Sequence, residues 1–65
     1  MKSVIISYEK ISPSVLANAI TSHCYNAIPM YKDIDEDYFE MEICGWLPLT
    51  AKDLATIERV LAPYV

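Results

Sequence analysis

The chain has 65 residues and a mass of 7.4 kDa, so it has room for one small domain, residues 1–65. A hydrophobic fraction of 54% with a single glycine excludes a disordered tail, a low-complexity linker and a collagen-like chain. Two cysteines are too few for a disulfide-rich scaffold. Nine acids against five bases give a net charge of −4, which argues against direct binding of nucleic acid.

No segment of the sequence has the length and hydrophobicity of a membrane span. The longest apolar run, residues 43–49, is interrupted by Gly45 and Pro48 and is far shorter than the ~20 residues that a span needs. The run Val4-Ile5-Ile6 is too short for the apolar core of a signal peptide. We therefore expect no membrane partner and a cytoplasmic protein, whose thiols stay reduced.

The first elements in the chain are a strand and a helix. Residues 2–9 alternate in polarity and are rich in β-branched side chains, which is typical of a strand. Ser12 and Pro13 fit the cap and the first position of a helix, and Asn26 fits a left-handed residue after its end. The expected apolar stripe of this helix comprises Leu16, Ala19, Ile20 and His23.

Two further strands and an acidic turn follow. Residues 27–34 predict a short strand, and because Pro29 cannot donate a ladder hydrogen bond, this strand lies at an edge or starts after the proline. Residues 38–44 alternate most clearly and predict the other half of a hairpin. One face of that strand carries Phe39, Met41 and Ile43, and the opposite face carries Tyr38, Glu40, Glu42 and Cys44.

A second helix completes the chain. Thr50 and Asp53 fit a capping box, and Pro63 ends the helix. The resulting order β-α-β-β-α predicts an α+β domain with a three-stranded, mainly antiparallel sheet and two helices packed on one face. The strand order stays open, because the first strand could pair with either strand of the hairpin. The expected core comprises Val4, Ile6, Leu16, Ile20, Phe39, Met41, Ile43, Leu54, Ile57 and Leu61.

The distribution of charge is the most informative feature for function. Residues 1–32 carry three lysines and one glutamate, whereas residues 33–65 carry eight acids and two bases. Six acids lie within ten residues that contain no base: Asp33, Asp35, Glu36, Asp37, Glu40 and Glu42. Such a patch can steer and complement a basic partner, with the flanking Tyr31 and Tyr38 as aromatic anchors. The alternative is that these charges only keep a strand edge soluble.

Three alternatives to this interpretation are calcium binding, zinc binding and nucleophilic catalysis. Asp33, Asp35 and Asp37 have the spacing of the first ligands of an EF-hand loop, but Tyr38 replaces its glycine and Cys44 its final glutamate. The other candidate groups for zinc or for nucleophilic catalysis are His23, Cys24 and Cys44, which form no CxxC or HxxxH pair and adjoin no basic cluster. We therefore expect no metal, no cofactor and no enzymatic activity.

Two functions from different classes remain. The first is a small acidic interaction module or inhibitor, whose acidic hairpin engages a basic surface of a partner protein, for example a surface that binds nucleic acid. The chain is similar in size, charge and compactness to the small acidic inhibitors of bacteriophages, which imitate nucleic acid as a class. The alternative is a structural subunit that forms a homodimer or larger oligomer through its apolar surface and sheet edge. A DNA-binding regulator is a weaker third interpretation, because the second helix offers only Lys52 and Arg59.

Overall fold

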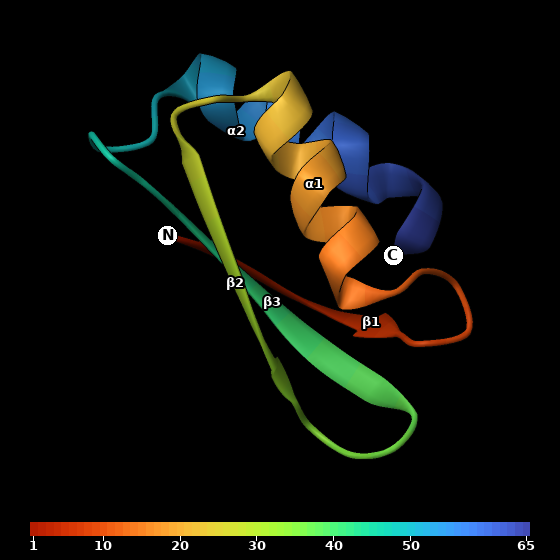
Figure 1. Ribbon diagram of the computed structural model, residues 1–65. Helices are drawn as coiled ribbons and strands as arrows, with labels where there is room; N and C mark the ends of the chain where they lie inside the picture. The colour runs from red at the N-terminus through yellow and green to blue at the C-terminus, as the bar shows by residue number, and fades with distance from the viewer.

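The computed structural model describes all residues from 1 to 65. The chain forms strand β1 (Lys2–Ser7), helix α1 (Pro13–His23), strands β2 (Ala27–Asp33) and β3 (Tyr38–Gly45), and helix α2 (Ala51–Leu61), as shown in Figure 1. A short 3-10 turn, Ala62–Tyr64, follows α2. The predicted order β-α-β-β-α is confirmed.

The three strands form one antiparallel sheet in the order β1-β3-β2. The strand β3 lies in the centre, because its hairpin partner β2 takes one side and β1 pairs with the other. The register places Ile6 opposite Phe39 and Tyr31 opposite Met41. The strand β2 is therefore an edge strand, as its proline predicts, and it includes that proline rather than starting after it. The open question of strand order is thus settled by the pairing of β1 with β3.

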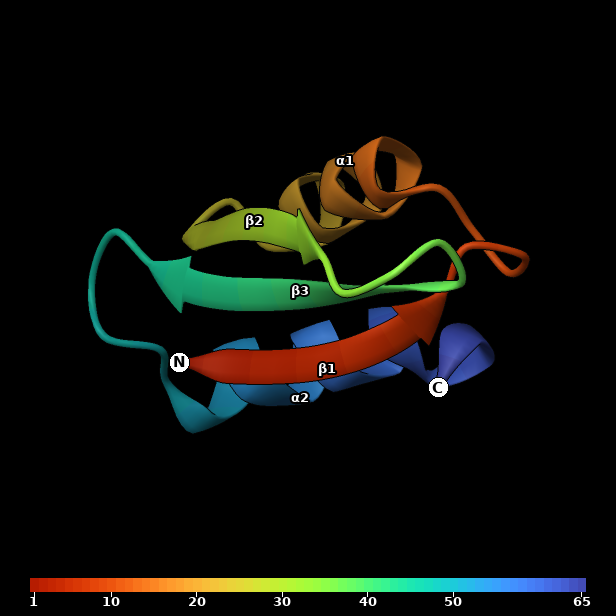
Figure 2. The same cartoon turned by 90° about the horizontal axis from the view of Figure 1, so that it is seen from below.

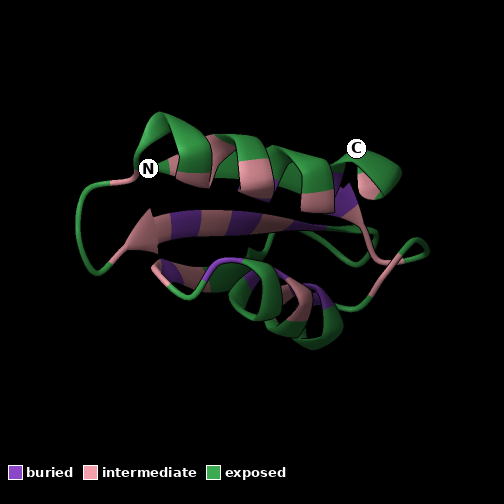
Figure 3. Ribbon diagram, turned by 90° about the horizontal axis from the view of Figure 1, so that it is seen from above, coloured by how far each residue is buried: buried purple, intermediate pink, exposed green.

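Both helices pack on the same face of the sheet, and the other face is open. Figure 2 views the molecule from the open side, with α2 behind β1 and α1 behind β2. The central strand alternates between buried residues that face the helices and half-buried residues that face outward (Figure 3). The core that this layering encloses consists of Ile6, Leu16, Ile20, Cys24, Ala27, Phe39, Met41, Ile43, Ile57 and Leu61.

Eight of the ten predicted core residues are fully buried, and two are not. Val4 is half-buried and packs against the core, whereas Leu54 is half-buried and lies outside it. The core gains Cys24 and Ala27, which pack where the chain passes from α1 into β2. His23, expected on the apolar stripe, is exposed, and it is the last residue of α1.

The helix ends follow local chemistry with one exception. Ser12 has the extended backbone of a cap and Pro13 begins α1, while Thr50 and Asp53 form the predicted capping box of α2. The prediction that Asn26 adopts a left-handed conformation is wrong, since no residue has a positive φ. Instead α1 ends at the extended residue Cys24, whose N–H donates to the carbonyl of Ile20. Neither helix combines the length and apolar character needed to cross a membrane.

Candidate interaction surface

Four exposed acids lie where β2 passes into β3: Asp33 at the end of β2, and Asp35, Glu36 and Asp37 in the loop between the two strands. The carboxylate of Asp35 accepts hydrogen bonds from the N–H groups of Asp37 and Tyr38, at 2.7 and 2.9 Å. The N–H of Ile34 donates to the carbonyl of Tyr38 at 3.1 Å, which closes the loop. Asp35 thereby holds the turn, as in an Asx turn, while Asp33, Glu36 and Asp37 are exposed.

The turn after β1 lies beside this loop. Figure 2 shows both connections at the same end of the sheet, and the N–H of Tyr8 donates to the carbonyl of Asp37 at 3.0 Å. This contact brings Glu9 next to the loop, where it shares a shallow depression of about 210 Å³ with Glu36 and Asp37. We call this surface the acidic end: it comprises residues 8–10 and 33–37, whose charged side chains are the acids Glu9, Asp33, Asp35, Glu36 and Asp37 and the base Lys10.

The acidic end accounts for the whole net charge of the protein. It contains five acids and one base, Lys10, and therefore has the same net charge of −4 as the full chain. The rest of the molecule is balanced, with four acids and four bases. Several of these are paired across the fold, such as Lys2 with Glu58 at 3.3 Å. The negative electrostatic potential of the molecule thus arises mainly from one end of the sheet.

Glu40 and Glu42 do not belong to the acidic end. Both lie on the open face of β3, where Lys32 of β2 approaches them at 3.3 and 3.9 Å. Glu40 also accepts a hydrogen bond from the hydroxyl of Ser3 at 2.7 Å. The hydrogen bonds from Ser3 and then from Lys32 lower the pKa of Glu40, although partial burial opposes them. The continuous ten-residue patch expected from the sequence is therefore split in two, because consecutive strand residues alternate between faces and neighbouring strands neutralise some of the acids.

The two predicted anchors, Tyr31 and Tyr38, lie on opposite faces of the sheet. The register places Tyr31 opposite Met41 on the helix side, where its ring meets Phe39 edge-on with centroids 6.2 Å apart. Tyr38 points to the open face beside the acidic loop and is 47% exposed. A third tyrosine, Tyr8, lines the depression with the loop acids and packs on Phe39 at 5.0 Å. Tyr8 is therefore a third aromatic neighbour of the loop acids, on the same face of the sheet as Tyr31.

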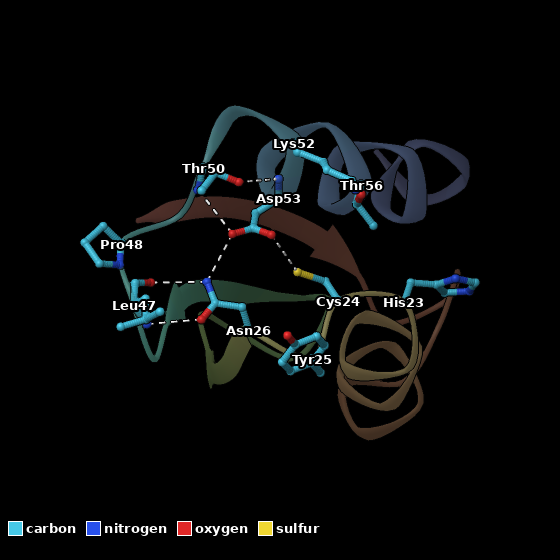
Figure 4. Close-up of a pocket in the computed structure, with 10 residues that line it drawn as sticks. All are labelled: His23, Cys24, Tyr25, Asn26, Leu47, Pro48, Thr50, Lys52, Asp53 and Thr56. Carbon is cyan, nitrogen blue, oxygen red and sulfur yellow. Dashed lines mark hydrogen bonds between the residues drawn. The ribbon is translucent and has the colours of Figure 1, made fainter.

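The opposite end of the molecule contains a groove of about 470 Å³ between α1, the β3–α2 connection and the start of α2 (Figure 4). Asn26 and Asp53 form its floor. The amide of Asn26 donates to Asp53 at 3.0 Å and to the carbonyl of Leu47 at 3.2 Å, and its oxygen accepts from the N–H of Leu47 at 3.1 Å. Asp53 also accepts from the backbone of Thr50 and from the thiol of Cys24. These contacts join the turn between α1 and β2, the connection between β3 and α2, and the first turn of α2.

The same contacts lower the pKa of Asp53 and occupy the polar groups at the floor of the groove. The hydrogen bond from the Thr50 backbone lowers the pKa of Asp53 most, followed by the amide of Asn26, while partial burial opposes both. Both carboxylate oxygens of Asp53 are thus engaged within the chain. No buried side-chain polar atom lacks a hydrogen-bond partner. The polar groups of the groove floor therefore hold the chain segments together and are not free to bind a ligand.

The groups that could support metal or nucleophilic chemistry lie apart from one another. Cys44 is on β3 with its thiol 3.8 Å from the carbonyl of Ile28, whereas His23 is exposed at the end of α1 on the other side of the sheet. Cys24 is buried against Asp53. No three side chains of His, Cys, Asp or Glu are close enough together to hold a metal ion.

Sequence reasoning identified the loop acids but missed Glu9 and Tyr8. Both precede the loop by more than twenty residues, and only the pairing of β1 with β3 brings them to the same end. The alternation of residues 2–9 predicted the strand. The position of its end beside the loop follows only from the strand order, which the sequence left open. No family model, curated protein or solved structure matches this chain.

Proposed function

We propose that the protein is a small cytoplasmic interaction module or inhibitor that acts without catalysis, by placing its acidic end against a basic surface of a partner protein. The observation that carries this proposal is the concentration of the entire net charge of −4 at one end, on two connections held by backbone hydrogen bonds. A charge fixed in this way is organised before binding, which reduces the entropy lost on association.

The chemistry of the acidic end favours an arginine- and lysine-rich partner. Exposed carboxylates can each accept a charge-assisted hydrogen bond from a guanidinium group, and a tyrosine ring can stack under it. Tyr8 and Tyr38 flank the carboxylates and supply such rings. Proteins that bind nucleic acid carry basic channels of this kind, so we take their phosphate-binding surfaces as the class of target, with phage-encoded inhibition as the biological setting.

Charge-neutral variants test the proposal. In the test variant, Glu9→Gln, Asp33→Asn, Glu36→Gln and Asp37→Asn leave Asp35 in place to hold the turn. At about 0.5 kcal/mol for each exposed charge contact, the four changes should weaken binding by about 2 kcal/mol, or roughly thirtyfold. The control, Glu42→Gln with Glu58→Gln, removes two acids outside the acidic end, and it should weaken binding by far less than half of the loss in the test variant.

The assay is capture of proteins from the source cells on the immobilised chain, followed by competition with duplex DNA. We expect a basic protein that the wild type and the control retain, that the test variant loses, and that DNA displaces. Equal retention by all three chains would contradict the proposal. Retention that DNA leaves unchanged would restrict the target to basic surfaces other than phosphate-binding ones.

A further inference from the structure

The strand β1 lies at the margin of the sheet with its outer side free. The N–H of Tyr8 donates toward β3, to the carbonyl of Asp37, and antiparallel pairing alternates inward and outward positions. Val4 and Ile6 therefore direct their backbone groups toward β3, whereas Ser3, Ile5 and Ser7 direct theirs away from the sheet. Of the outward carbonyls, only that of Ser7 has a partner within the chain, the N–H of Lys10 at 3.1 Å.

The other margin of the sheet is protected, and β1 is not. On β2 the outward positions include Pro29, which has no N–H to offer, and Asp33, whose charge opposes an approaching strand. The N–H of Ala27 on the same side already donates to Cys24. In contrast, β1 has no proline, no bulge and no charged residue after Lys2, and Ile5 at its centre is 61% exposed. These are the features of an edge that accepts another strand.

The side of α2 that lies next to β1 also carries only one charged residue, Glu58, which pairs with Lys2. Lys52 and Thr56 line the groove beside α1, so the residues on the other side of the helix face away from α1. We call these residues the outer flank of α2, and they are Ala51, Leu54, Ala55, Glu58 and Ala62. Glu58 pairs with Lys2 at the start of β1, which places the outer flank on the β1 side. This position explains why Leu54 lies outside the core of the single chain.

We propose that a second copy of this chain occupies the β1 margin, with the two β1 strands paired antiparallel across a two-fold axis at Ile5. A two-fold axis makes the contact self-complementary and closed. The two Ile5 residues exchange two backbone hydrogen bonds, and each Ser7 N–H donates to the Ser3 carbonyl of the other copy. The product is a continuous six-stranded sheet with all helices on one face.

Charge and apolar surface both favour this arrangement over another partner strand. Antiparallel pairing brings Lys2, at the start of one strand, beside Tyr8 and Glu9, at the end of the other, and does so twice. It also brings the outer flanks of the two α2 helices together, where alanines allow close approach and Leu54 gains cover. The acids of residues 33–37 in the two copies then lie at opposite ends of the joined sheet and remain accessible.

Amide hydrogen exchange and sedimentation of the wild-type chain test the proposal directly. We expect a dimer at high concentration, in which the Ile5 and Ser7 amides exchange at least tenfold more slowly than in dilute solution. The Val4 and Ile6 amides, bonded to β3, should be protected at both concentrations. A chain that remains monomeric at millimolar concentration, or a dimer whose Ile5 and Ser7 amides exchange freely, would overturn the proposal.

Two variants at one position separate backbone pairing from side-chain contact. Ile5→Pro removes an outward N–H that the single chain does not use, so the fold should persist and dimerisation should weaken at least tenfold. Ile5→Thr keeps the N–H and the β-branch, and should still dimerise. A dimer of undiminished affinity in a folded Ile5→Pro chain would refute the pairing. If Ile5→Pro does not fold, the wild-type exchange measurement decides the question alone.

Discussion

Replacement of the single glycine, Gly45, by alanine tests how the junction at the groove end is built. Gly45 ends β3 with a negative φ, so the glycine is not needed for its backbone conformation. It is needed for space, because an added Cβ would overlap the carbonyl oxygen of Leu47 and lie 2.8 Å from the amide nitrogen of Asn26. The nearest obstacle is backbone, which cannot rotate away as a flexible side chain could.

The cost of Gly45→Ala can be estimated from what must move. Displacing the Leu47 carbonyl breaks its hydrogen bond from Asn26 and strains the one that Asn26 accepts, at about 1 kcal/mol each. Local overpacking adds about 1–3 kcal/mol, and the reduced freedom of the unfolded chain returns about 0.4–1 kcal/mol. The expected net loss is about 3 kcal/mol, a large share of the roughly 3–10 kcal/mol of total stability typical for this length.

Urea denaturation followed by far-ultraviolet circular dichroism measures this loss, since both helices report on the fold. Trp46 fluorescence is a poor probe, because Trp46 adjoins the mutated position and is 76% exposed. The control is the same glycine substitution in an Asn26→Ala background, where one obstacle is gone and the additional cost should be smaller. A Gly45→Ala chain within about 0.5 kcal/mol of the wild type would refute the role assigned to this close contact.

Three further predictions concern the capping box, the core and acid sensitivity. Thr50→Ala removes the oxygen that accepts from the Asp53 N–H and should cost about 1 kcal/mol in urea denaturation, while an unchanged midpoint would contradict the box. Phe39→Ala should cost about 3–5 kcal/mol because the ring is fully buried under Tyr8, whereas Tyr25→Ala, at a residue 91% exposed, should have little effect. The pKa values of Asp53 and Glu40 are lowered in the folded chain, so their stabilisation is present above the pKa values of the unfolded chain, near pH 4, and is lost as the pH falls through the lowered values. Asp53→Asn should flatten the decline of unfolding free energy on acidification, and an unchanged slope would count against the network.

The fold could be predicted because each element carries its own local signal. The alternation of β3 identified its buried face, and Ser12 with Pro13 and Thr50 with Asp53 fixed the starts of both helices. The order of the strands could not be predicted, because the pairing of β1 depends on contacts between residues 31 to 41 positions apart. Leu54 was assigned to the core because its spacing fits the apolar stripe, but spacing does not show which side of a helix another element covers.

The candidate site was only partly predictable for the same reason. The acids of the loop are contiguous in sequence, so their exposure and proximity followed from the hairpin. The neutralisation of Glu40 and Glu42 by Lys32, and the addition of Glu9, both arise from neighbours across strands. Asn26 was assigned to a helix end from its usual preference, while its actual role, bonding to Leu47 and Asp53, is set by contacts distant in sequence.

The central claim is that the acidic end, and not the open face of the sheet, receives a basic partner. The most direct measurement is a titration of the isotopically labelled chain with an oligoarginine peptide, followed residue by residue by nuclear magnetic resonance at low and at physiological salt. The account predicts shifts confined to residues 8–9 and 33–38, which diminish as salt rises. Shifts centred instead on Glu40 and Glu42, or on the groove around Asn26, would contradict it.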